Sequence, residues 1–159
     1  MAAPDGAHAI ELVGAEDLPE LLPLMRAYCD FYRTAPSDIA LLDVSRALLA
    51  DAEREGLQMI ARDQEGGAAV GFTTLLWSWD TTEASRIGIM HDLYVAPHAR
   101  GSGLADRLIA AALECCRAHG ASRMEWQTGR ENLRAQAVYD RVGGVREPFV
   151  IYTKAAASL

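Results

Sequence analysis

The apolar positions in the first part of the chain alternate at first and then recur at helical spacing. Residues 9–13 alternate apolar and polar side chains, as a short strand does. An apolar stripe at spacings of three and four then predicts a helix that begins near Glu16 and ends before Pro36. Ser37 is a candidate N-cap for a second helix, which we expect to extend to about Glu55.

The rest of the chain predicts strands that alternate with helices. Strands over 57–63 and 68–79 are separated by turn residues and predict a hairpin, and a third strand follows over 87–95. Helices are predicted over 103–119 and 132–142, and strands over 122–128 and 145–153, where Pro148 favours an edge position or a bulge. This order predicts an α/β fold, a mixed central sheet with helices on both faces. We expect a single domain over 1–159, with residues 1–8 disordered.

Composition narrows the class of protein. The 159 residues carry a formal net charge of −7, which disfavours a nucleic-acid partner. The chain has no apolar run of the roughly 20 residues that cross a bilayer, and its start lacks a signal-peptide pattern. We therefore expect a cytoplasmic protein without a membrane partner. Cys29, Cys115 and Cys116 have no CxxC spacing, so we expect reduced packing residues and no metal site.

The most informative stretch is a turn between the strand over 87–95 and the helix that follows it. Gly101 and Gly103 flank the small Ser102, so backbone N–H groups at the helix start can approach one anion. A P-loop is excluded because no Lys follows Gly103, and Asp106 stands where a dinucleotide fingerprint needs a small residue. The turn is either a diphosphate cradle or turn geometry with no ligand.

Two motifs give the chain a resemblance to a known family. Arg100-Gly101-Ser102-Gly103-Leu104-Ala105 fits the pattern Arg/Gln-x-x-Gly-x-Gly/Ala, and 132–144 fits Asn-x-x-Ala-x-x-x-Tyr-x-x-x-Gly. The chain thus resembles the GNAT superfamily of acyl-CoA-dependent N-acyltransferases, over about residues 9–153 and with the same order of elements. The resemblance implies a GNAT-like fold.

The resemblance also implies a cofactor site for acetyl-CoA, with no metal. The backbone of Leu93, Tyr94 and Val95 would pair with the pantetheine arm, and an N–H group near Leu93 would stabilise the oxyanion. The pyrophosphate would be held by the backbone N–H groups of Arg100, Gly101, Ser102, Gly103, Leu104 and Ala105.

Three further residues are candidates for the chemistry. Tyr139 matches the family's general acid, yet it shares a stripe with Val138 and Val142 and is otherwise a core residue. Asn132 either caps its helix or contacts the cofactor arm. His91 interrupts an apolar strand and titrates near neutrality, so it is either the base that deprotonates the amine or a buried, hydrogen-bonded histidine.

The resemblance indicates only the region of the acceptor pocket. In this family the pocket is built from the first two helices, the central strands and the last strand pair. Asp92 is expected on the opposite face from His91, where it would orient a neighbour or bind a cationic substrate, and Asp30, Asp80 and Glu83 are further acids that would attract one. The alternative is ordinary packing and solvated acids. The aromatic candidates for this pocket are Phe31, Tyr32, Trp77, Trp79 and Tyr152.

The implied activity is transfer of an acetyl group from acetyl-CoA to a primary amine of a small molecule, by direct attack in a ternary complex. The alternatives are a catalytically silent acyl-CoA sensor, acetylation of a protein amine, and a structural protein with the same fold. The sequence does not decide whether the chain forms a homodimer. These motifs do not encode the acceptor amine or the acyl chain.

Overall fold

The computed structural model describes residues 8–63 and 67–156, and the chain forms two compact units, residues 1–127 and 128–159. Residues 1–7, most of the segment expected to be disordered, lie outside the described residues, whereas His8 begins the first strand. The strands of the first unit are β1 (His8–Leu12), β2 (Gly56–Asp63), β3 (Ala69–Asp80), β4 (Ser85–Val95) and β5 (Met124–Glu125). Its helices are α1 (Leu18–Phe31), α2 (Asp38–Ala50) and α3 (Leu104–Ala118), with short 3-10 turns η1 (Ala15–Asp17) and η2 (Pro97–Ala99).

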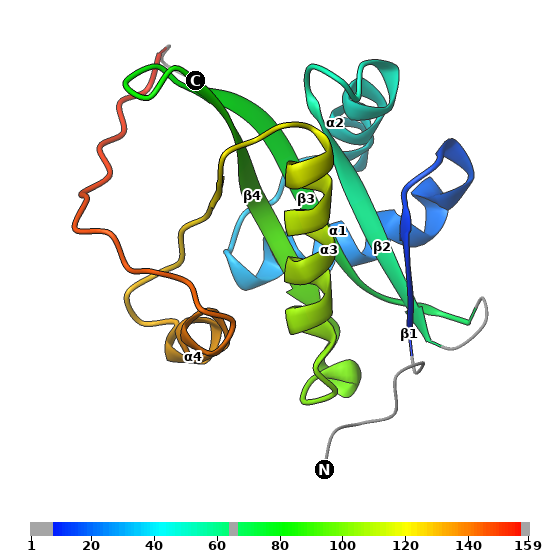
Figure 1. The fold of residues 1–159 in the computed structure, drawn as a ribbon. Coiled ribbons are helices and arrows are strands. Elements are labelled where there is room, and N and C mark those ends of the chain that lie inside the picture. Colours follow the sequence, from blue (N-terminus) through cyan, green and yellow to red (C-terminus); the bar gives the residue numbers. More distant parts are fainter. Residues whose placement is uncertain (1–7, 64–66, 157–159) are drawn as a thin grey trace. The chain divides into compact units, whose positions relative to one another are not determined.

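The five strands form one mixed sheet in the order β1-β2-β3-β4-β5 (Figure 1). The first three pairings are antiparallel, and β4 pairs with β5 in parallel. A parallel pair requires a crossover, which α3 supplies. The predicted mixed sheet is confirmed.

Helices cover both faces of this sheet, as the sequence predicts. On one face, Leu21 of α1 and Leu41 of α2 pack with Phe72 of β3. On the other face, Leu104 and Leu108 of α3 pack with residues of β2 and β3. Figure 1 shows α3 on one side of the strands and α1 on the other. No helix of the described residues is both long and apolar enough to span a membrane.

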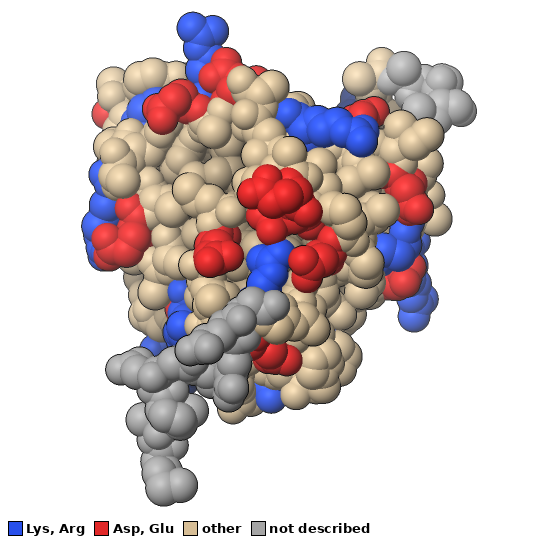
Figure 2. Space-filling view, turned by 90° about the vertical axis from the view of Figure 1, so that its right-hand side faces the viewer, with Lys and Arg blue, Asp and Glu red and all other residues tan. Residues whose placement is uncertain are grey.

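One buried arginine joins β2 to the start of α1. Arg62 is 8% exposed and lies 2.7 Å from Asp17 and 3.1 Å from Glu20, with Glu11 at 3.9 Å. Figure 2 looks onto the side of the unit that carries β1, where acidic side chains gather around a basic group. Buried charges need such partners because burial removes their hydration. This cluster therefore fixes α1 against the sheet.

The second helix is shorter than predicted. Ser37 caps it as expected, because its Oγ accepts from the Ala40 N–H at 3.1 Å. The helix ends at Ala50, and the carbonyls of Ala52 and Glu55 accept instead from the indole and the backbone N–H of Trp77. The N–H groups of Asp51 and Glu55 still donate to carbonyls four residues back, so it is the carbonyls of Ala52 and Glu55 that bond to β3 instead of continuing the helix.

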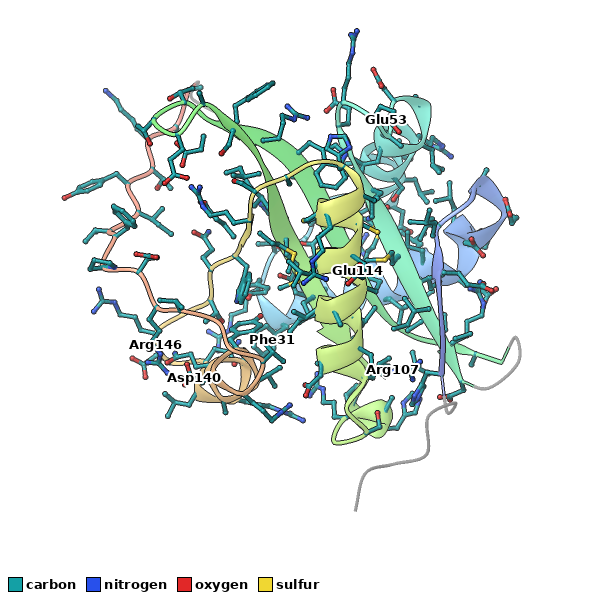
Figure 3. All side chains as sticks on the ribbon, viewed as in Figure 1. Phe31, Glu53, Arg107, Glu114, Asp140 and Arg146 are labelled. Carbon is teal, nitrogen blue, oxygen red and sulfur yellow. The ribbon has the colours of Figure 1, made fainter. Side chains whose placement is uncertain are left out.

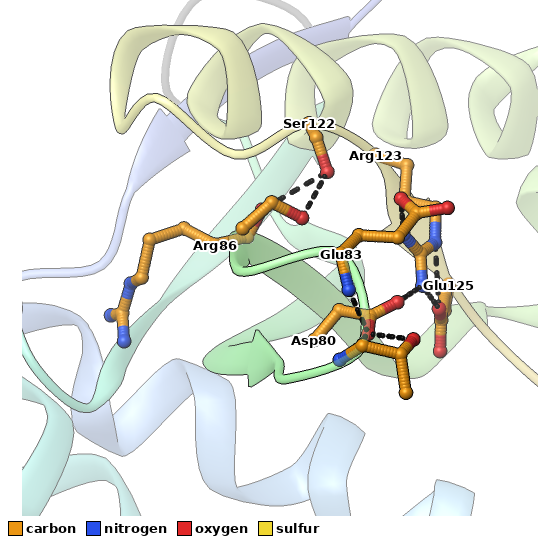
Figure 4. Close-up of polar contacts among 8 residues, drawn as sticks. Asp80, Glu83, Arg86, Ser122, Arg123 and Glu125 are labelled. Atoms are coloured by element: carbon orange, nitrogen blue, oxygen red, sulfur yellow. Dashed lines mark hydrogen bonds and ion pairs between the residues drawn. The ribbon is translucent and has the colours of Figure 1, made fainter.

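An ion-pair cluster fixes the start of β5. Arg123 contacts Asp80 and Glu83 at the turn between β3 and β4, and it also contacts Glu125 (Figure 4). Its hydrogen bond holds the pKa of Asp80 well below the usual range. The cluster places Met124 and Glu125 beside Gly88 and Ile89 of β4.

The second unit contains one helix, α4 (Leu133–Arg141). Asn132 caps it, because its Oδ1 accepts from the Ala135 N–H at 3.2 Å. The helix ends in a turn in which Gly143 has a φ of 85° and the Gly144 N–H donates to the Tyr139 carbonyl. Two hydrogen bonds from Arg146 to Asp140, labelled in Figure 3, follow this turn. The predicted capping role of Asn132 is confirmed.

Two predicted strands differ from the structure. The strand expected over 122–128 is reduced to Met124–Glu125, because its ladder with β4 covers two pairs of residues. The strand expected over 145–153 is wrong, since these residues form no regular element. Alternating apolar residues indicate strand propensity, but a strand is stabilised by a neighbouring ladder, and Pro148 lacks an N–H group to contribute to one.

Candidate active site at the free edge of the fourth strand

The turn before α3 has the backbone of an anion cradle. Gly101 and Gly103 have φ values of 79° and 78°, a left-handed conformation that glycine adopts without strain. A Cβ built on either glycine would meet nothing within 4 Å, so the space beside both is open. Gly103 is the N-cap of α3 and provides no side-chain cap, which leaves the positive end of the helix dipole to a ligand.

Two side chains of the turn hold its shape. Arg100 donates from Nε to the Val95 carbonyl at 2.8 Å, and its guanidinium lies 6.0 Å from the centre of the Tyr94 ring. Ser102 donates from Oγ to the Ala99 carbonyl at 2.7 Å. The side chains of Arg100 and Ser102 thus brace the loop, while its backbone N–H groups line the helix start.

A β-bulge interrupts β4 just before the predicted pantetheine segment. Thr74 of β3 is opposite Asp92, but the next residue, Leu75, is opposite Met90. His91 is therefore the extra residue, which has no Cα partner in β3. A bulge changes the direction in which the following backbone groups point.

Two backbone hydrogen bonds show the result of this bulge. The Gly88 N–H donates to the Arg123 carbonyl, on the β5 side, whereas the Ala96 N–H donates to the Val70 carbonyl, on the β3 side. N–H groups alternate between the two edges along a regular strand, so residues 88 and 96 would face the same edge without a bulge. The bulge inverts this alternation, and the N–H groups of Leu93 and Val95 consequently face the β5 side.

This edge of β4 has no strand beside it in the described part of the chain beyond Ile89, where the ladder with β5 ends. Leu93 and Val95 therefore present backbone groups on an open edge that leads toward the glycine turn. Tyr94, like its two neighbours, is opposite a residue of β3, but its N–H faces β3, as the Ala96 N–H does. The Tyr94 ring packs 6.2 Å from the ring of Phe72.

His91 and Asp92 form a pair at the bulge. The His91 side chain is 65% exposed, so the interpretation of a buried histidine is wrong. Its Nδ1 lies 3.4 Å from Asp92 Oδ1, so the two side chains do not point to opposite faces as expected, because the bulge breaks the alternation. The hydrogen bond with Asp92 raises the pKa of His91 by more than burial lowers it.

An aromatic cluster at the end of α1 adjoins this pair. The Tyr28 ring lies 5.0 Å from that of Tyr32 and 6.4 Å from that of Tyr94, and Phe31 packs against Tyr32 at 5.1 Å. Phe31 and Tyr32, both predicted for the acceptor pocket, are exposed. The sequence does not single out Tyr28, because it shares the apolar stripe of its helix and nothing in that spacing separates it from packing residues.

The tryptophans predicted for the same pocket lie elsewhere. Trp77 stacks on His119 with ring centres 3.8 Å apart. Trp77 lines a hollow of about 450 Å³ together with Leu48 and Gln58. Trp79 is opposite Arg86, whose guanidinium covers its ring at 4.9 Å. The structure does not bring either tryptophan together with the His91–Asp92 pair.

The remaining candidate residues pair with other side chains, are exposed, or belong to the second unit. Asp80 and Glu83 pair with Arg123, while Asp30 is exposed at the end of α1. Tyr139 and Asn132 belong to the second unit, where Tyr139 is partly buried on α4. Within residues 8–63 and 67–156, no group of three or more His, Cys, Asp or Glu side chains is arranged to hold a metal ion.

Comparisons with known proteins identify the family. The family model described as "Acetyltransferase (GNAT) family" matches residues 21–144. An uncharacterized N-acetyltransferase, YhfO of Bacillus subtilis, is 34% identical over 127 residues, which are 80% of this chain and 83% of that protein. The D-amino-acid N-acetyltransferase HPA3 of Saccharomyces cerevisiae is 29% identical over 75% of this chain and 73% of its own length.

Solved structures share the fold. A probable acetyltransferase has a TM-score of 0.83 at 28% identity and covers 95% of this chain and 99% of its own. The aminoglycoside N-acetyltransferase AAC(6')-Iy, in complex with CoA, has a TM-score of 0.82 at 23% identity over 98% of this chain and 99% of its own. With the family match spanning most of the sequence, the chain belongs to the acetyltransferase (GNAT) family and is an acyl-CoA-dependent acetyltransferase.

Proposed function

We propose that the protein transfers an acetyl group from acetyl-CoA to a primary amine of a small molecule, by direct attack in a ternary complex. The observation that carries this proposal is the open edge of β4 beyond its bulge, which continues into the glycine turn at the uncapped start of α3. A strand edge can pair with an extended amide-containing arm, and a helix start can hold its phosphates.

The backbone of this unit fits the donor. Leu93 and Val95 would pair with the pantetheine arm, and the N–H groups from Arg100 to Ala105 would hold the pyrophosphate in the open space beside Gly101 and Gly103. When bound, acetyl-CoA supplies an acetyl group activated as a thioester. The Leu93 N–H would stabilise the negative charge that develops on the acetyl oxygen, since a fixed donor needs no reorganisation.

Two side chains would move the protons. An alkylammonium has a pKa near 10.4, so a base that accepts a proton from the amine speeds attack at neutral pH. His91 is exposed at the bulge, two residues before Leu93, and would be this base. Tyr139, which matches the family motif, would donate a proton to the departing thiolate, and Asn132 would contact the cofactor arm in addition to capping α4.

The acceptor would bind near the end of α1. Asp92 is a carboxylate with 19% of its side chain exposed. Tyr28 links this region to the exposed rings of Phe31 and Tyr32. Its hydroxyl donates to the His91 carbonyl, and its ring packs on that of Tyr32. A carboxylate next to aromatic faces suits a cationic amine that has an apolar part. Two of the similar proteins support small amines: one is named a D-amino-acid N-acetyltransferase, and AAC(6')-Iy was crystallised with a bisubstrate analogue of CoA and an acetylneamine.

The direct test is a panel of amines that includes amino acids, diamines, aminoglycosides and lysine peptides. We expect acetyl-CoA to stabilise the protein against heat, and at least one small amine to release free CoA thiol in amounts equal to the acetylated product. Stabilisation without thiol release for every amine would indicate a silent sensor. Faster turnover of lysine peptides than of any small amine would contradict the proposed substrate class.

The His91–Asp92 pair predicts a pH dependence. A base acts in its neutral form, so kcat/KM should rise with pH through the raised pKa of His91. Asp92→Asn removes the charge that raises this pKa, and the acid limb of the kcat/KM profile should move to lower pH. His91→Ala should remove the limb. An acid limb that stays in place in both variants would exclude His91 as the base.

A further inference from the structure

The bulge in β4 is held by two side-chain hydroxyls. The Thr73 hydroxyl of β3 donates to the Asp92 carbonyl at 2.8 Å, and the Tyr28 hydroxyl of α1 donates to the His91 carbonyl at 3.4 Å. These consecutive carbonyls belong to the extra residue and to its successor. The Asp92 carbonyl is on the β3 side of the strand, because the Leu93 N–H group of the same trans peptide faces the β5 side.

The two hydroxyls reach the bulge from opposite faces of the sheet. A Cβ on Gly71 would meet side chains of α3, so Thr73, two residues further along β3, is on the α3 face. Phe72 lies between Gly71 and Thr73 in the sequence and faces α1, and the Tyr28 ring packs on the Phe72 ring. The bulge is therefore held on the α3 face of the sheet by a side chain of β3, and on the opposite face by a side chain of α1.

The position of the bulge decides which N–H groups face the open edge. With His91 as the extra residue, those of Leu93 and Val95 face outward. A bulge two residues closer to Val95 would turn the Asp92 N–H outward and the Leu93 N–H toward β3, because alternation resumes only after the extra residue. A donor pointing inward cannot contact the acetyl oxygen.

We propose that Thr73 and Tyr28 are positioning residues, which lock the bulge at His91 and thereby hold the Leu93 N–H toward the reacting thioester. This inference rests on the proposed function for its catalytic consequence. The Thr73 bond is the shorter of the two and comes from a fully buried side chain, so Thr73 is expected to contribute more than Tyr28.

The test compares Thr73→Val with Thr73→Ser, which keeps the hydroxyl, and with Thr74→Val as a matched control. Thr74 is the neighbouring buried threonine, and its Oγ1 accepts from Gln58 rather than contacting β4. We expect Thr73→Val to lower kcat about tenfold, a fraction of the loss from deleting an oxyanion donor. Thr73→Ser should retain most of kcat, Tyr28→Phe should lower it less, and Thr74→Val should leave it near the wild-type value.

Amide hydrogen exchange of the ligand-free protein, measured by NMR, gives a readout independent of turnover. In the wild type, the Tyr94 amide should exchange slowly and the Leu93 and Val95 amides quickly, and Thr73→Val should reduce this contrast while Thr74→Val keeps it. The inference is overturned if Thr73→Val keeps both kcat and the exchange pattern, or if Thr74→Val causes the same losses. A wild type without turnover would contradict the proposed function alone, because the exchange pattern still tests whether Thr73 holds the bulge at His91.

Discussion

Gly103→Ala is expected to weaken CoA binding by about tenfold or more, while it costs the fold about as much as a glycine replacement far from the turn. The backbone of Gly103 has a φ of 78°, where a side chain adds about 1–2 kcal/mol of strain. The new Cβ would also project into the open space in front of the helix start, where we place the pyrophosphate. Loss of one or two charge-assisted hydrogen bonds, each about 1.5–3 kcal/mol, corresponds to tenfold or more in Kd.

The chain offers a matched control in Gly120, just beyond the C-terminal end of the same helix. Gly120 also has a φ of 78° and nothing within 4 Å of a built Cβ. Gly120→Ala should therefore lower the free energy of unfolding by a similar amount, with no change in the Kd for CoA measured by calorimetry. Equal Kd values for both variants would show that the turn does not hold the pyrophosphate.

A truncated donor sharpens the same test. An acetyl thioester of pantetheine lacks the pyrophosphate, so wild type and Gly103→Ala should use it with the same kcat/KM. If Gly103→Ala loses as much activity with this donor as with acetyl-CoA, the defect lies in the fold of the turn and not in recognition of phosphate.

Hydrophobic periodicity was sufficient to predict the layers of the first unit. The stripe that includes Leu21 and Met25 lies against the sheet, and so does the stripe of Leu104 and Leu108. Caps were equally local signals, since Ser37 and Asn132 each accept the N–H group three residues on. The mixed sheet with helices on both faces follows from such local patterns and from the order of the elements.

Features that depend on a distant partner were not predictable in this way. Residues 52–55 leave the helical pattern because Trp77, more than 20 residues away, takes two of their carbonyls. The segment 145–153 has the composition of a strand but no ladder. A sequence pattern specifies a preference, whereas pairing depends on what tertiary structure places beside the segment.

In the candidate site, too, local features were predictable from the sequence, and features that depend on a distant strand were not. The glycines and Arg100 were found from their motif, because their roles are local to the turn. The bulge at His91 has no marker in the sequence. It nevertheless determines that the N–H group of Leu93, and not that of Tyr94, faces the open edge of β4. Thr73 became visible only through the register of β3 against β4.

Tyr139→Phe is expected to lower kcat by a factor of about ten to a thousand, with little change in the Kd for CoA. The phenol has a pKa near 10, so it is protonated at neutral pH and can donate to a thiolate whose conjugate acid has a pKa near 8.5. Phenylalanine keeps the ring on α4 and removes the proton donor. An interaction that acts only as the C–S bond breaks affects kcat and kcat/KM equally.

The acidity of the leaving thiol separates a general acid from a packing residue. A donor with a more acidic thiol needs less proton transfer, so the deficit of Tyr139→Phe should shrink when such an acetyl thioester replaces acetyl-CoA in single-turnover measurements. A core tyrosine would instead lower the free energy of unfolding and give the same deficit with both donors. Unchanged kcat with acetyl-CoA would remove Tyr139 from the chemistry and leave the Leu93 N–H to stabilise the transition state without an acid on α4.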